Sequence, residues 1–307
     1  MQMTRSFSAT AKCQPGKSAT LCRDLGACLD GVAQWMSSNR LQLNAGKSEF
    51  MWRVPPRRRQ RLPTDQLIVQ STSVAPVASV RDLDVHLDSD MSMHTHITQL
   101  VCSCYGVLRQ LSSIRRSLPR SALTTLVTSF ITSKFHYCNV ALAGLDRVQS
   151  VINAVARLTA DARRYDHVIQ LLTDLHWLWV PQRIQYKLCV LVYGCLNGTA
   201  LGYLSDLTVS VGSTARRQLR SASTSNLVVP PTRRASIGDR AFAVAGQQAW
   251  NSLPPALHST SKFLSSFKKN LNRFFLVSHS GRDNVNNDNV KGSRNSLYRT
   301  IALYKLA

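Results

Sequence analysis

One lysine stands beside a predicted turn in residues 40–49, whose sequence is RLQLNAGKSE. Leu41 and Leu43 alternate with polar residues, and Asn44-Ala45-Gly46 is typical of a turn, so the segment predicts a turn that leads into a strand. An ammonium group at such a turn, here that of Lys47, stabilises negative charge that develops in a reaction. The alternative is that Lys47 is a solvated side chain on a surface turn.

Carboxylates and imidazoles gather between residues 86 and 96, where the side chains that can ligate metals are His86, Asp88, Asp90, His94 and His96. Oxygen and imidazole ligands of this kind suit a divalent metal ion. Two other patterns do not make sites. The Gly-Lys-Ser triplets at residues 16–18 and 46–48 lack the first glycine of a phosphate-binding loop, and residues 102–104 have no partners at zinc-ligand spacing.

The strongest binding feature is a series of basic clusters. The formal net charge of +22 attracts a polyanion over long range. A guanidinium group holds phosphate through two N–H donors, and such contacts position a nucleic acid without reading its bases. The alternative is a basic surface that only keeps the chain soluble. The residues predicted to contact nucleic acid are Arg57, Arg58, Arg59, Arg61, Arg109, Arg115, Arg116, Arg216, Arg217, Arg220, Lys268 and Lys269.

Aromatic side chains could add base stacking to these phosphate contacts. Tyr105, Trp177 and Tyr186 all occupy apolar positions of predicted helices. We therefore expect these three rings in the core rather than against bases.

Hydrophobic periodicity predicts the elements that position these residues. Short strands are expected near the N-terminus, at residues 49–54, 67–70 and 80–87, with a proline-rich loop at 55–63. Helices are expected at residues 18–38, from 93 to about 142 with a second helix opened by Pro119, and at 147–158, 168–175, 181–196 and 261–275. With 44% hydrophobic residues the chain can bury a sizeable core, so the sequence predicts an α+β fold that is mostly helical.

Two of these blocks resemble the reverse transcriptases of non-LTR, LINE- or jockey-like retrotransposons. Residues 41–49 are similar to Leu-x-Leu-Asn-x-x-Lys-Ser/Thr-Glu, the palm motif that follows the catalytic Asp-Asp strand by one helix in that family. Residues 175–187 (LHWLWVPQRIQYK) are similar to Leu-His-Trp-Leu-x-Val-x-x-Arg-Ile-x-Tyr/Phe-Lys. Shorter matches at residues 241–242 and 249–254 follow in the same order, and the resemblance covers roughly residues 18–277.

The resemblance implies a truncated reverse-transcriptase palm of short antiparallel strands plus a helix, followed by a helical thumb and a mostly helical C-terminal region. The palm remnant, with the lysine motif and a primer-grip-like hairpin, would span residues 1–91. The thumb would span 92–145, the C-terminal region 146–277 and a disordered tail 278–307. Lys47 corresponds to the family lysine near the incoming triphosphate, and is in that sense the catalytic position.

The intact family is an RNA-directed DNA polymerase whose aspartates hold two magnesium ions for nucleotidyl transfer. No two aspartates are adjacent in this sequence. We therefore expect a C-terminal fragment without the metal ligands, catalytically inactive and without a cofactor of its own.

The resemblance also bears on the histidine and aspartate cluster. Residues 83–88 (LDVHLD) are similar to the primer-grip sequence Leu-Gly-Val-x-Leu/Ile-Asp, whose aspartate is not a catalytic ligand. A hairpin is therefore a better interpretation of this region than a metal site. Asp84 replaces the family glycine, so we expect backbone strain at that residue.

The expected function is nonspecific binding of RNA and DNA through the basic surface, with no membrane association. The alternatives are a host-adopted helical scaffold that binds a protein partner and a pseudogene product without function. Eight cysteines without a Cys-x-x-Cys pair favour reduced thiols in an intracellular protein of the nucleus or cytoplasm. The first 23 residues lack acidic side chains and resemble a mitochondrial transit peptide, which gives a second expectation for localisation.

Overall fold

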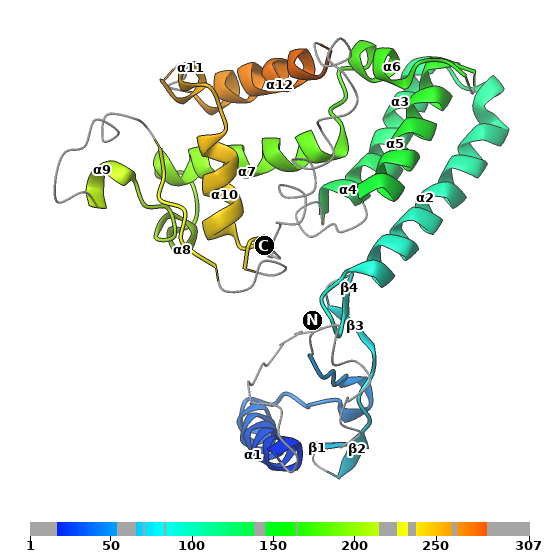
Figure 1. The fold of residues 1–307 in the computed structure, drawn as a ribbon. Coiled ribbons are helices and arrows are strands. Elements are labelled where there is room, and N and C mark those ends of the chain that lie inside the picture. Colours follow the sequence, from blue (N-terminus) through cyan, green and yellow to red (C-terminus); the bar gives the residue numbers. More distant parts are fainter. Residues whose placement is uncertain are drawn as a thin grey trace. The chain divides into compact units, whose positions relative to one another are not determined.

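The computed structural model describes residues 17–53, 66–69, 71–82, 84–137, 145–163, 165–214, 226–232, 238–259 and 263–280. The chain forms two compact units that divide between His96 and Ile97. Helices dominate the described residues, and two short antiparallel sheets of two strands each accompany them (Figure 1). This is the mixed α+β composition that the sequence predicts.

In the first unit, helix α1 (Lys17–Ser38) packs against a hairpin of strands β1 (Leu67–Val69) and β2 (Thr72–Val74). Leu67 pairs with Val74, and the strand residues Leu67 and Val69 are buried against Cys22 of α1. The side chains packed around this small core are Leu25, Leu29, Leu43, Phe50, Trp52 and Val74. The helix predicted at residues 18–38 is confirmed.

The strand predicted at residues 49–54 is wrong over its described part. The lysine turn is the short 3-10 helix η1 (Ala45–Lys47), and beyond it only Phe50 pairs, through one isolated bridge to Pro76. The amide of Val77 donates to the Phe50 carbonyl over 2.8 Å. The Phe50 carbonyl therefore bonds the residue after Pro76, and residues 51–53 show no further bridge in the described ranges.

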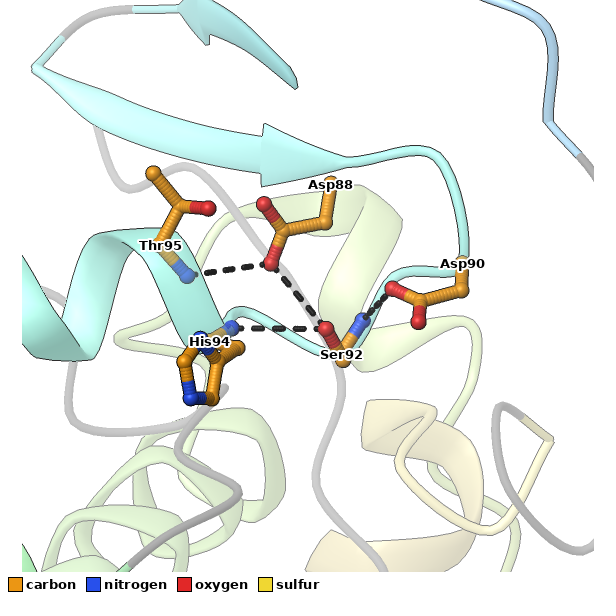
Figure 2. Close-up of a pocket in the computed structure, with 5 residues that line it drawn as sticks. All are labelled: Asp88, Asp90, Ser92, His94 and Thr95. Atoms are coloured by element: carbon orange, nitrogen blue, oxygen red, sulfur yellow. Dashed lines mark hydrogen bonds between the residues drawn. The ribbon is translucent and has the colours of Figure 1, made fainter. Parts of the chain in front are cut away.

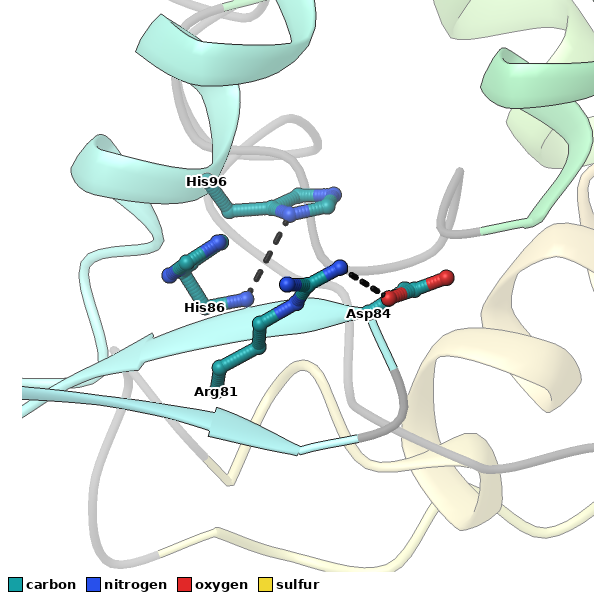
Figure 3. A network of polar contacts seen from close by, with 4 residues as sticks. All are labelled: Arg81, Asp84, His86 and His96. Atoms are coloured by element: carbon teal, nitrogen blue, oxygen red, sulfur yellow. Dashed lines mark hydrogen bonds and ion pairs between the residues drawn. The ribbon is translucent and has the colours of Figure 1, made fainter.

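The strand predicted at residues 80–87 is a hairpin instead. Strand β3 (Ser79–Asp82) pairs with strand β4 (Val85–Asp88), and Ser79 lies opposite Asp88. Asp84 stands in the connection with φ of +65°, the left-handed region that glycine adopts most easily. The expected strain at Asp84 is therefore present, and the Arg81 side chain bonds its carboxylate (Figure 3).

The second unit begins with a cluster of helices that shares one apolar core. Pro119 precedes α3, as predicted, with φ of −67° that suits a helix start. The cluster consists of α2 (His94–Ile114), η3 (Arg115–Ser117), α3 (Arg120–Val127), η4 (Thr128–Thr132), α4 (Ser133–Tyr137) and α5 (Leu145–Ala160). Its buried side chains include Ile97, Val101, Cys104, Leu108 and Leu111 of α2, Leu123, Val127, Ile131 and Phe135 of α3 to α4, and Val148, Val151 and Val155 of α5.

The π-helical turn η4 changes which residues face that core. Leu123, Val127, Ile131 and Phe135 are buried at a constant spacing of four residues, because a π-turn holds more residues than an α-turn. Phe130, the apolar residue next to Ile131, is 51% exposed.

The remaining helices surround α7 (Val180–Leu196), which contacts α10 (Phe242–Asn251), α12 (Leu264–Ser280) and α5. The ring of Tyr193 stacks on Phe267 with centroids 4.4 Å apart. Phe267, Leu271 and Phe275 form the buried face of α12, whereas Phe263, just before the helix, is exposed. The shorter helices are α6 (Val168–Asp174), α8 (Gly202–Ser205), α9 (Val211–Thr214) and α11 (Pro255–Ser259).

Among the described helices, none combines the length and apolar character that a membrane span requires.

Candidate nucleic-acid interface

Lys47 lies at the end of η1 with an exposed side chain. The Lys47 amide and the Ser48 hydroxyl both donate to the Asn44 carbonyl, over 3.2 and 3.1 Å, and these bonds close the turn. Glu49 accepts a hydrogen bond from the Arg81 amide over 3.3 Å, which joins the turn to β3. The described part of this motif therefore holds a surface turn in place, and Lys47 projects from it.

The aspartates after β4 line an open pocket of about 370 Å³ together with Ser92, His94 and Thr95 (Figure 2). Asp88 accepts hydrogen bonds from the Ser92 hydroxyl over 3.0 Å and from the Thr95 amide over 3.2 Å. Asp90 accepts from the Ser92 amide over 2.9 Å. The bond from Thr95 satisfies an amide group in the first turn of α2, and the bonds from Ser92 hold the turn before the helix. These residues therefore form a helix cap.

Asp88 is a buried carboxylate that stays ionised. Burial by itself raises the pKa of Asp88, but hydrogen bonds from Thr95, Ser92 and the backbone of His94 outweigh it and hold the pKa below its ordinary value. The negative charge also complements the positive N-terminal end of α2. Asp88 therefore anchors the connection between β4 and α2.

His96 lies beside this cap and forms one hydrogen bond to His86. The His86 amide donates to Nδ1 of His96 over 3.4 Å, and the two rings lie 6.4 Å apart (Figure 3). The proton of the neutral ring is then on Nε2, a buried atom without a hydrogen-bond partner among the described residues. Burial, and next the charge of His86, lower the pKa of His96, while Asp88 opposes the shift.

A metal centre finds no support in this geometry. Within the described ranges, no three His, Cys, Asp or Glu side chains are arranged to hold a metal ion. The two aspartates of the predicted cluster, Asp88 and Asp90, instead accept hydrogen bonds from Ser92 and Thr95 in the turn that leads into α2.

Arg109 is the one arginine of α2, and it lies on the solvent-facing side of the helix. Ile97, Val101, Cys104, Leu108 and Leu111 turn the other side into the core. Tyr105 and Arg109 are one helical turn apart and exposed, and Arg116 of η3 is exposed beyond them. The side chains of Arg109 and Arg116 form no hydrogen bond or ion pair with any described residue, so their guanidinium groups face solvent.

Helix α5 runs beside α2 and is joined to it by polar bonds at three levels. Arg147 of α5 donates from Nη1 to the Thr98 hydroxyl over 3.0 Å. The hydroxyl groups of Tyr105 and Ser150 are 3.0 Å apart. Further along, Arg115 forms an ion pair with Asp161, the residue that follows α5. We call the exposed residues Tyr105, Arg109, Arg116, Arg147 and Ser150 the α2–α5 surface.

The predicted contact residues fall into three groups: exposed residues, one residue in an ion pair, and residues outside the described ranges. Arg109 and Arg116 belong to the α2–α5 surface, whereas the guanidinium group of Arg115 is already paired with Asp161. Lys268 and Lys269 are exposed on α12, which packs against α7 and α11. Arg57, Arg58, Arg59, Arg61, Arg216, Arg217 and Arg220 lie outside the described residues.

Two residues of the surface escaped the sequence analysis. Arg147 follows Asp146 and has no other basic residue near it in the sequence, so it belongs to none of the predicted basic clusters. Tyr105 sits at an apolar helical position and was expected in the core, yet it is 38% exposed. The signal that could have found Tyr105 is its spacing of four residues to Arg109 on a helix whose other side is fully apolar.

Residues 175–187, the longer block of the family resemblance, hold the start of α7 in place. The Gln182 side chain accepts from the Trp179 amide over 3.3 Å and donates to the Phe275 carbonyl over 3.0 Å. Arg183 donates from Nε to the Leu178 carbonyl over 2.8 Å, and burial lowers the pKa of Arg183 to about 10. Trp177 and Tyr186 are partly buried. These contacts give the block a packing role.

No family model, no curated protein and no solved structure matches this chain.

Proposed function

We propose that this chain binds RNA and DNA without sequence specificity, through phosphate contacts on the α2–α5 surface. The observation that carries the proposal is the set of exposed guanidinium groups of Arg109, Arg116 and Arg147, which pair with no carboxylate among the described residues and lie near hydroxyl groups. Guanidinium and hydroxyl groups are the usual protein partners of phosphate oxygens. The net charge of +22 adds long-range attraction to any polyanion.

We further propose that the chain derives from a non-LTR reverse transcriptase and transfers no nucleotide by itself. The support is the order and spacing of the two blocks at residues 41–49 and 175–187, together with the absence of adjacent aspartates from the sequence. In this proposal the first unit is a palm remnant, the helices α2 to α4 correspond to the thumb, and Lys47 retains an ancestral position. Two-metal catalysis needs carboxylates that hold both ions.

Primer extension tests this part directly. A primed RNA template, magnesium and deoxynucleotides are incubated with the full chain, and binding of the same RNA–DNA hybrid is followed in parallel. We expect hybrid binding without extension. Extension that disappears in the Lys47→Ala variant would contradict the proposal, because it would require metal ligands that the proposal does not assign to this chain.

A protein-binding scaffold is the second candidate function, and exposed apolar side chains favour it. Leu201, Tyr203, Val209 and Val229 are all more than a third exposed. Val209 and Val229 flank a short antiparallel contact in which Ser210 pairs with Leu227. Exposed apolar side chains near a strand-like pair are typical of protein interfaces.

A further inference from the structure

Tyr105 is an aromatic ring on a surface made otherwise of cations and hydroxyl groups. Its neighbours Cys104 and Leu108 are buried, while 38% of Tyr105 remains accessible. An aromatic ring left at the surface beside arginines offers a flat face to a planar ligand. The basic side chains explain attraction to phosphate, but they do not explain why an aromatic ring is held among them.

The hydrogen bonds around Tyr105 fix the position of its ring. The Ser150 hydroxyl donates its single proton to the Arg147 carbonyl over 2.8 Å. In the 3.0 Å contact between Tyr105 and Ser150, the tyrosine hydroxyl must then be the donor. A ring held at its far end by this bond loses little conformational freedom when a ligand packs against it.

Two arginines lie on either side of Tyr105 along α2, because Arg147 bonds Thr98, which precedes Tyr105 by seven residues, and Arg109 follows it by four. Arg109 follows Tyr105 by one turn, a rise of about 6 Å along α2, and its side chain has no partner in the described ranges. Arg147 uses one N–H group for Thr98 and leaves its other donors without a described protein partner. The ring therefore lies between two cations that can hold neighbouring phosphates.

We propose that Tyr105 stacks on an unpaired base of single-stranded nucleic acid while Arg109 and Arg147 hold the adjoining phosphates. The inference rests on the proposed nucleic-acid binding and specifies its preferred substrate. In a duplex both faces of each base are covered by neighbouring pairs, so only a single strand offers a free face. Stacking adds affinity without sequence selectivity, because every base has such a face.

The test compares two probes, a labelled oligothymidylate and a labelled duplex DNA of the same length, bound to the full chain. Tyr105→Leu removes the aromatic face and should weaken oligothymidylate binding by about five- to tenfold, with duplex binding unchanged. Tyr105→Phe keeps the face, loses only the bond to Ser150, and should retain most of the affinity. Tyr203, a tyrosine of α8 that is 47% exposed, supplies the control Tyr203→Leu, which should change neither affinity.

A second readout locates the contact. Oligodeoxyuridine that carries bromouracil is irradiated with the wild-type chain, and the crosslinked peptide is found by mass spectrometry. We expect the crosslink in the α2 peptide that contains Tyr105. Equal loss of single-strand and duplex binding in Tyr105→Leu, or no loss in either, would overturn stacking while phosphate binding stands. Absence of wild-type binding to both probes would instead remove the proposed function itself.

Discussion

At the scale of single residues, His96 is a buried histidine whose surroundings oppose its charged form. The ring is only 7% exposed, its Nδ1 atom accepts from the His86 amide, and its Nε2 atom has no partner among the described residues. A second proton would break the bond from His86 and place a cation beside another histidine and the positive end of α2. The neutral form is therefore part of the folded structure.

This environment predicts that acid weakens the connection between β4 and α2. The pKa of folded His96 is lowered from the ordinary value of 6.5. Below pH 6.5 this histidine therefore binds a proton more readily in the unfolded chain than in the folded chain. Stability is lost as pH falls below 6.5, by at most about 1.4 kcal/mol per pH unit for one such group, until the pH reaches the lowered pKa. Hydrogen exchange of peptides that cover residues 85–96, corrected for intrinsic rates, measures this loss.

The matched variants are His96→Asn and His94→Asn. Asparagine at position 96 keeps an acceptor for the His86 amide and does not titrate, so the loss of protection between pH 7.5 and 5.5 should become smaller. His94 is exposed at the start of the same helix, and its replacement should leave the pH dependence intact. Equal pH dependence in wild type and His96→Asn would refute this role of His96.

Predictions for single residues agreed with the structure where backbone geometry determines the outcome. They failed where contacts between distant residues determine it. Asp84 in place of a family glycine predicted strain, and its φ of +65° agrees. Tyr105 was assigned to the core because its position is apolar in a helical pattern, yet a hydroxyl bond to Ser150 keeps its ring at the surface. That bond joins residues 45 positions apart, which no local pattern contains.

At the scale of elements, the close approach of α7 and α10 depends on Gly246. A Cβ atom added there would lie 3.1 Å from both Phe242 and Val192. The two helices would have to separate by a few tenths of an ångström at a buried contact. We expect Gly246→Ala to destabilise the protein by about 1 kcal/mol, since an overpacking cost of about 1–3 kcal/mol exceeds the helix propensity gained by alanine.

Gly106 provides the opposite case on α2. Its added Cβ atom would meet nothing within 4 Å, so Gly106→Ala gains helix propensity without a clash. We expect this variant to be more stable than wild type by up to about 1 kcal/mol. Thermal melting of the two variants should therefore shift in opposite directions. Equal shifts would contradict the packing described for Gly246.

Elements were predictable where apolar residues keep the helical spacing over many positions. They were less predictable where a single residue alters the backbone geometry. The helix at 18–38 and those that became α5, α6 and α7 agree with the periodicity within about two residues. The π-turn η4 placed Phe130 outside the core, and Phe50 forms a single bridge to Pro76 where a strand was predicted. Neither effect is visible in the hydrophobic pattern of its own segment, because each depends on how a neighbouring turn or strand is built.

At the scale of the whole molecule, the sequence shows the total charge clearly, but it does not show where on the surface that charge lies. The total of +22 could be read at once, but which arginines face solvent without a partner could not. Arg115 is neutralised by Asp161, whereas Arg147, outside every basic cluster, stands on the α2–α5 surface. The site therefore required the arrangement of α2 and α5, which lie side by side (Figure 1).

The salt dependence of binding to duplex DNA tests the central proposal most directly. Each phosphate contact releases a counterion, so the slope of log affinity against log salt should fall by about 1 for each arginine removed. The variant Arg109→Gln, Arg116→Gln, Arg147→Gln should lose about three units of slope. A control that removes equal charge from the first unit, Arg23→Gln, Lys47→Gln, Arg53→Gln, should retain most of it. Equal slopes in both variants, or wild-type binding that does not respond to salt, would contradict phosphate binding on the α2–α5 surface.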